Sequence, residues 1–120
     1  VWPVTIVEHE TDHHLTRVAF AGGKLSLPMV DAAIGTSLRV QIYARDVSIA
    51  LEVPIATSIL NVLPATITGL SDDRGGQSMV RLQVGKQALL AHITRKSALL
   101  LSLQIGMTVY VQIKGTSILN

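Results

Sequence analysis

Short runs in which apolar and polar residues alternate fill most of this chain. Such alternation, rich in Val, Ile and Thr, is typical of strands that bury one face. It predicts strands at 3–9, 15–20, 24–30, 37–44, 47–53, 64–70, 78–84, 87–93 and 108–114. Gly22-Gly23, Gly75-Gly76 and Gly85-Lys86 predict tight turns between neighbouring strands. We therefore expect an all-β fold.

One segment has a helical pattern instead. It follows Thr94, reads "RKSALLLSL" and ends near Leu103. The Thr94 hydroxyl can accept a hydrogen bond from a free N–H group of the first turn, and Gly106 lies beyond the end. The sequence therefore predicts one short helix, in the second half of the chain.

The two halves of the chain echo each other. Residues 3–6, PVTI, return as PATI at 64–67, and VQI at 40–42 returns at 111–113. The second spacing is longer mainly because the first half lacks the helix. Two copies of one β unit explain these echoes most simply. A unit of about five strands fits a Greek-key barrel of the OB type.

We accordingly expect two OB-like units in tandem, the first at residues 1–56 and the second at 57–120. A unit of roughly 60 residues is marginally stable alone. We therefore expect the two units to pack together or to exchange strands.

Composition narrows the class of protein. Hydrophobic residues make up 48% and charged residues 15%, which excludes a disordered tail, and no apolar run is long enough for a membrane-spanning helix. The net charge is +2 and aromatic residues make up 3%, so the basic and aromatic surface of nucleic-acid-binding proteins is absent. The chain has no cysteine, which suits a cytosolic protein. Its first residue is Val1 and not Met, and we expect a piece of a longer protein without a signal peptide.

Several polar clusters have plain structural explanations. Residues 8–14, EHETDHH, lack the ligand spacing of a metal site and predict a solvated hairpin end without metal. Residues 72–76, DDRGG, lack the length and distal Glu of a calcium loop and predict a turn. Arg45 and Asp46 predict a local ion pair, and His92 a partly buried neutral side chain. No phosphate-binding loop or catalytic triad is visible, so we do not expect this segment to be an enzyme.

Three motifs in the second half resemble a known family. They are the segment Thr57–Asn61 (TSILN, here called the lead-in segment), the turn Thr94-x-x-Ser97, and the exit Val111-x-Ile113-Lys114. Together they resemble the Mop domain, a molybdate–tungstate binding domain. The first half, ending in ARDVS at 44–48, is similar to the TOBE-type OB-like segment that precedes the Mop unit in transporter ATPases. The whole chain thus resembles the C-terminal region of the ATP-binding subunit of bacterial molybdate ABC transporters.

The resemblance implies an oxyanion site and no covalently bound cofactor. In the family, donors for molybdate or tungstate come from the three motifs across subunit interfaces. The matching residues here are Ser58, Leu60, Asn61, Thr94, Ser97 and Lys114. One position departs from the family pattern: Leu60 stands where members that bind the anion well often have Arg, which removes a bidentate donor and a positive charge.

The resemblance also implies a role and partners. The segment would be an accessory or regulatory domain of a molybdate importer's ATPase subunit, cytoplasmic and peripheral to the inner membrane. Its partners would be a second copy in a homodimer, an upstream nucleotide-binding domain and the membrane permease subunits, and not nucleic acid.

Two alternatives stay open. One is a dimerisation module without ligand, in which Thr94 only caps the helix and Lys114 is a solvated strand residue. The other is a stand-alone molybdate-storage protein, against which the missing Thr-x-x-Ser helix of the first half argues.

Overall fold

Ten strands, two 3-10 turns and one α-helix make up the protein in the computed structural model, which describes residues 1–119. The all-β class is therefore confirmed. The strands are β1 (Trp2–Glu10), β2 (Leu15–Phe20), β3 (Gly23–Pro28), β4 (Ser37–Gln41), β5 (Val47–Ala50), β6 (Asn61–Asp72), β7 (Gln77–Val84), β8 (Gln87–Thr94), β9 (Thr108–Ile113) and β10 (Ser117–Leu119). The remaining elements are η1 (Thr11–His13), η2 (Ala44–Asp46) and α1 (Arg95–Leu100).

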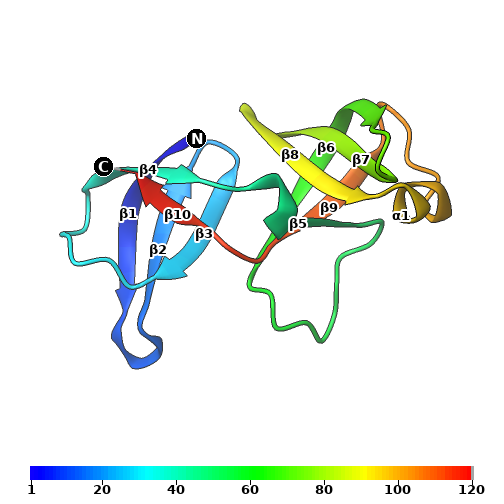
Figure 1. Cartoon of the computed structure of the whole chain (residues 1–120). Helices are drawn as coiled ribbons and strands as arrows, with labels where there is room; N and C mark the ends of the chain where they lie inside the picture. Colours follow the sequence, from blue (N-terminus) through cyan, green and yellow to red (C-terminus); the bar gives the residue numbers. More distant parts are fainter. Residues whose placement is uncertain (120) are drawn as a thin grey trace.

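The strands form two curled antiparallel sheets of five strands each, which Figure 1 shows as two lobes. The first lobe has the order β10-β4-β1-β2-β3, and the second lobe has the order β5-β9-β6-β7-β8. Each lobe takes one edge strand from the other half of the sequence. Strand β5 pairs with β9, and β10 pairs with β4. The two halves thus exchange strands, while the division of the sequence between residues 56 and 57 remains a prediction.

The registers of the two lobes confirm the internal repeat. Trp2 pairs with Val40 in the first lobe, and Leu63 pairs with Val111 in the second. Both long strands carry a bulge at the same place, directly after Ile6 in β1 and after Ile67 in β6. A bulge bends a strand and increases its twist. The shared bulge therefore curls both sheets in the same way.

One continuous hydrophobic core runs through both lobes. The inward positions of β1 and β6 are almost fully buried, while their outward neighbours are exposed, as the alternation in the sequence predicts. The largest fully buried side chains are Ile6, Leu25, Leu27, Ile67, Leu82 and Ile113. The core therefore relies on aliphatic side chains.

The lobes touch where two hairpin turns meet. A Cβ at Gly85 would lie 2.6 Å from the Cα of Gly22, so the two backbones can approach this closely only as glycines. Beside this contact the Trp2 indole N–H donates to the carbonyl of Ala88 in the second lobe (2.8 Å). The Trp2 ring also packs on Phe20, with ring centroids 4.7 Å apart. The backbone contact and the hydrogen bond from Trp2 to Ala88 thus join the lobes, and Phe20 of the first lobe supports the Trp2 ring.

Other sequence predictions had mixed outcomes. The helix is present with Thr94 as its N-cap, but it ends at Leu100, earlier than predicted. Strand β10 was not predicted as a separate element, because its three residues gain their strand conformation only by pairing with β4 in the other lobe. The turns at 22, 75–76 and 85–86 are confirmed.

Residues 11–14 at the end of the β1–β2 hairpin are exposed, as predicted, but His9 in the same stretch is held by hydrogen bonds. The two ring nitrogens of His9 lie 2.9 Å from Thr16 Oγ1 and 2.7 Å from the carbonyl oxygen of Ala32. Thr16 is fully buried, so His9 is fixed between β2 and the loop after β3. Among residues 1–119, no group of three or more His, Asp or Glu side chains comes together as a metal site would require. No helix in this range is both long and apolar enough for a membrane crossing.

Candidate oxyanion site

The lead-in segment Thr57–Asn61 crosses the surface before β6 begins. Ser58 is exposed, and the side chain of Leu60 is 66% exposed. Thr57 Oγ1 accepts hydrogen bonds from the Ile59 N–H and from the Gln112 amide, both at 3.2 Å. Because Gln112 lies in β9, these bonds hold the segment beside the exit motif.

Asn61, the last residue of this segment, is bonded to the first lobe. Its Oδ1 accepts from the Ser26 N–H (2.7 Å), and its Nδ2 donates to the Ser26 carbonyl (2.9 Å). Its backbone pairs with Ile113 of β9. Asn61 therefore ties the lead-in segment to both the first lobe and the exit strand.

The exit residue Lys114 follows β9 and is exposed. Its N–H donates to the carbonyl of Asp46 in η2 (2.9 Å). The Asp46 carboxylate lies against the next residue, where a Cβ on Gly115 would be 3.2 Å from Oδ2. A carboxylate thus lies against the residue that follows Lys114, and its negative charge opposes the binding of an anion at the exit motif.

The prediction of an ion pair between Arg45 and Asp46 is wrong. The Arg45 guanidinium instead lies over the ring of Tyr43, 4.9 Å from its centroid, which is a cation–π contact. Asp46 turns toward the second lobe's exit motif. Adjacent residues of a 3-10 turn point in different directions, and this separates the two charges.

The Thr94-x-x-Ser97 turn is closed by its own hydrogen bonds. Thr94 Oγ1 accepts from the Ser97 N–H (3.0 Å) and donates to Ser97 Oγ (2.8 Å). Ser97 borders a shallow groove of about 230 Å³. The other groove residues are Ser48, Ile49, Ile93, Leu100 and Leu101. The Ser97 hydroxyl therefore lies in a mainly apolar setting.

Arg95 anchors this turn to the β6–β7 hairpin. Its N–H donates to the Gly76 carbonyl (2.9 Å), and its guanidinium donates to the carbonyl of Asp73 and lies 3.6 Å from the Asp72 carboxylate.

In the same hairpin the N–H groups of Gln77 and Gly75 donate to the Asp73 carboxylate, and these bonds lower the pKa of Asp73. His92 lies 3.8 Å from Asp73 and adds to the effect.

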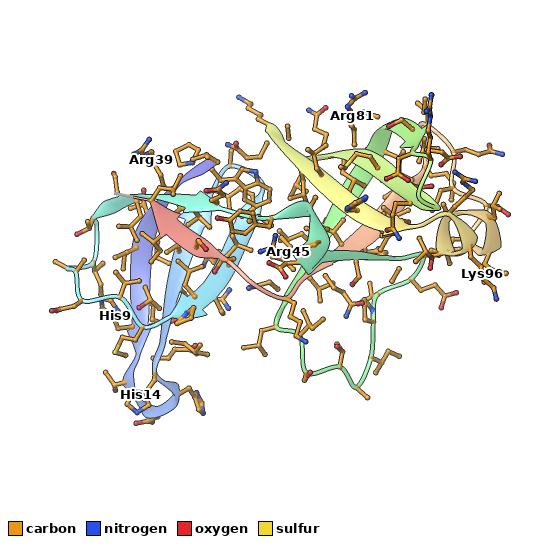
Figure 2. All side chains as sticks on the ribbon, in the orientation of Figure 1. His9, His14, Arg39, Arg45, Arg81 and Lys96 are labelled. Atoms are coloured by element: carbon orange, nitrogen blue, oxygen red, sulfur yellow. The ribbon has the colours of Figure 1, made fainter. Side chains whose placement is uncertain are left out.

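The six predicted site residues fall into two separate groups. One group contains Ser58, Leu60, Asn61 and Lys114, where the chain passes between the lobes. The other contains Thr94 and Ser97, beside α1 at the outer end of the second lobe (Figure 1). Figure 2 shows the same separation: Arg45 of η2 lies between the lobes, and Lys96 of α1 lies at the outer end. Within residues 1–119 no hydrogen bond or ion pair joins the two groups.

Two residues that lie beside the first group were not predicted there from the sequence. Asp46 and Ser26 belong to the first half, and each meets the second lobe only because the chain crosses between the lobes. The return of VQI, residues 40–42, at 111–113 was the signal for this crossing, since the segment after each copy leads into an exchanged strand.

Comparison with known proteins decides the family. Residues 57–119, more than half of the chain, match the TOBE domain family. This chain belongs to that family. The TOBE match covers all six predicted site residues.

Relatives of this TOBE domain align with almost its whole length. It is 50% identical over 97% of its length to the molybdenum import ATP-binding protein ModC of Albidiferax ferrireducens, and 42% identical over 96% to that of Aromatoleum aromaticum. The alignments cover 31% and 30% of those proteins. The chain thus spans about a third of the length of the curated relatives it matches.

A solved structure shares the fold of this TOBE domain. The cytoplasmic molybdate-binding protein ModG, crystallised with molybdate bound, superposes with a TM-score of 0.81 over 98% of this chain and 92% of that one. The sequences are 17% identical, so this likeness concerns the fold alone. It agrees with the tandem OB-like arrangement predicted from the sequence.

Proposed function

We propose that this TOBE domain is the regulatory C-terminal domain of the ATP-binding subunit of a molybdate importer. Its ligand is molybdate or tungstate, held without a covalent cofactor. Its partners are a second copy of itself, the upstream nucleotide-binding domain and the permease subunits, at the cytoplasmic face of the inner membrane. The domain does not hydrolyse ATP; that activity belongs to the parent chain.

The alignment with ModC proteins carries this proposal. An identity of 50% over 97% of the chain extends through both lobes, so the tandem arrangement as a whole is shared with a molybdenum import ATP-binding protein. The fold shared with ModG, whose structure holds molybdate, supports the choice of ligand.

The separation of the site residues suggests how the anion is held. A tetrahedral dianion needs donors that converge from several directions. Lys114 and the backbone N–H of Leu60 would supply one side, next to Asn61, and Thr94 and Ser97 of a second copy would supply the other. A site shared between copies makes ligand binding favour one arrangement of the two subunits, which is what regulation requires.

The second candidate function is dimerisation without ligand. The exposed Leu60 and the Asp46 carboxylate beside the exit motif favour it, because the first lacks the charge of Arg and the second opposes an anion.

Calorimetric titration with molybdate, tungstate and sulfate separates the two functions. The chain without substitutions should release or absorb heat with molybdate or tungstate. Leu60→Arg should bind these anions more tightly because it restores a bidentate cationic donor. Absence of heat from both proteins with all three anions would leave dimerisation as the function.

A further inference from the structure

Asn61 acts as a piece of strand on the open edge of the first lobe. Strand β3 ends its sheet, so the backbone groups that point away from β2 have no strand partner. Ser26 pairs with Arg17 of β2 on its inner side. On its outer side its N–H and carbonyl are bonded to the two ends of the Asn61 amide, at 2.7 and 2.9 Å. The side chain thereby satisfies both backbone groups, as a neighbouring strand would.

The same residue fixes the place where the lead-in segment becomes β6. Asn61 is paired through its backbone with Ile113, the residue before Lys114. Leu60 lies directly before it and is 66% exposed. The two amide bonds therefore set how the backbone of Leu60 and Asn61 lies relative to Lys114.

We propose that Asn61 is a positioning residue through which the first lobe controls the affinity of the oxyanion site. The Ser26 backbone holds the Asn61 side chain, and this places the lead-in backbone N–H groups for the anion. The proposal deepens the proposed function and rests on it for the identity of the ligand. It also assigns a role to the first lobe, which supplies no side chain to the predicted site.

Substitutions at Ser26, in the first lobe, test the positioning role of Asn61. Ser26→Pro removes the N–H that Asn61 accepts, and proline is tolerated where an edge-strand N–H points away from its sheet. Ser26→Ala is the matched control, since it keeps that N–H and loses only the hydroxyl, which accepts from Arg17 at 3.3 Å. By calorimetry with molybdate, Ser26→Pro should weaken binding about threefold to tenfold, the effect of one lost hydrogen bond. Ser26→Ala should bind like the parent.

Asn61→Ala gives a second, independent route. It should weaken binding by a similar factor, and the double variant Asn61→Ala/Ser26→Pro should bind no more weakly than the weaker single variant, because both changes break the same link. A merely structural role would lower the melting temperature without this non-additive effect on affinity. Equal affinities for Ser26→Pro and Ser26→Ala, or fully additive losses, would overturn the proposal.

Hydrogen exchange separates this proposal from the choice of ligand. If the parent chain gives no heat with molybdate, the proposed function fails, but the positioning still predicts a change in the lead-in segment. The Leu60 amide should exchange faster in Ser26→Pro and Asn61→Ala than in the parent and in Ser26→Ala. Unchanged exchange at Leu60 in both variants would contradict the positioning role whatever the ligand is.

Discussion

At the scale of single residues, Lys114 offers the only full positive charge among the six predicted site residues. Removing a charged partner from an anion typically costs about 1.5–3 kcal/mol, or roughly tenfold to a hundredfold in affinity. Lys114→Ala should therefore weaken molybdate binding by about this factor. Lys24→Ala is the control, because Lys24 is an exposed lysine on β3 in the first lobe. Equal affinity of the two variants in calorimetry would remove Lys114 from the site.

Asp73 gives a prediction of pH dependence. The N–H groups of Gln77 and Gly75 hold its pKa below the ordinary value, so its charged form stabilises the folded state above the unfolded pKa of about 4. This stabilisation is lost as the pH falls through the lowered pKa. Asp73→Asn should therefore melt at a lower temperature than the parent at neutral pH, and the difference should shrink in acid. A difference that stays constant or grows as the pH falls would contradict this.

At the scale of elements, the contact between two hairpin turns should be sensitive to a single methyl group. Gly85 has a φ of +58°, and its Cβ would lie 2.6 Å from Gly22 Cα. Gly76 also has a positive φ, +79°, but its Cβ would meet nothing within 4 Å. Gly76→Ala should lower the free energy of unfolding by about 1–2 kcal/mol through backbone strain alone. Gly85→Ala should lower the free energy of unfolding by this amount and by about 1–3 kcal/mol more, because its methyl group overpacks the contact with Gly22. If urea unfolding gave the same loss of unfolding free energy for Gly76→Ala and Gly85→Ala, the two hairpin turns would not be in tight contact.

The elements also show how far the sequence could predict this fold. Alternation and glycine pairs located the strands from β1 to β9, because burial of one face dictates those patterns. Thr94 marked the helix start through its capping hydroxyl. Strand β10 and the exchange of edge strands escaped prediction, since both depend on pairing between distant segments. The six candidate site residues follow from the resemblance to the family, whereas the bonds of Asn61 to Ser26 and of Lys114 to Asp46 follow only from the three-dimensional arrangement.

At the scale of the whole molecule, the two lobes share one core and exchange edge strands, so they form a single folded unit. In this unit the segment after β9, which begins with Lys114, passes between the lobes, and α1, which Thr94 caps, lies at the outer end of the second lobe (Figure 1). We therefore expect an anion that uses both groups to lie between two copies of the chain. Dimerisation and ligand binding should then be linked, because a ligand held between subunits stabilises their association.

Native mass spectrometry of the chain with molybdate tests this central claim most directly. The site proposed here predicts a species of twice the chain mass of 12.9 kDa that carries molybdate, together with a monomer that carries none. Adding molybdate should raise the fraction of the dimer. Molybdate bound to the monomer, or a dimer whose fraction and mass do not respond to molybdate, would contradict the account.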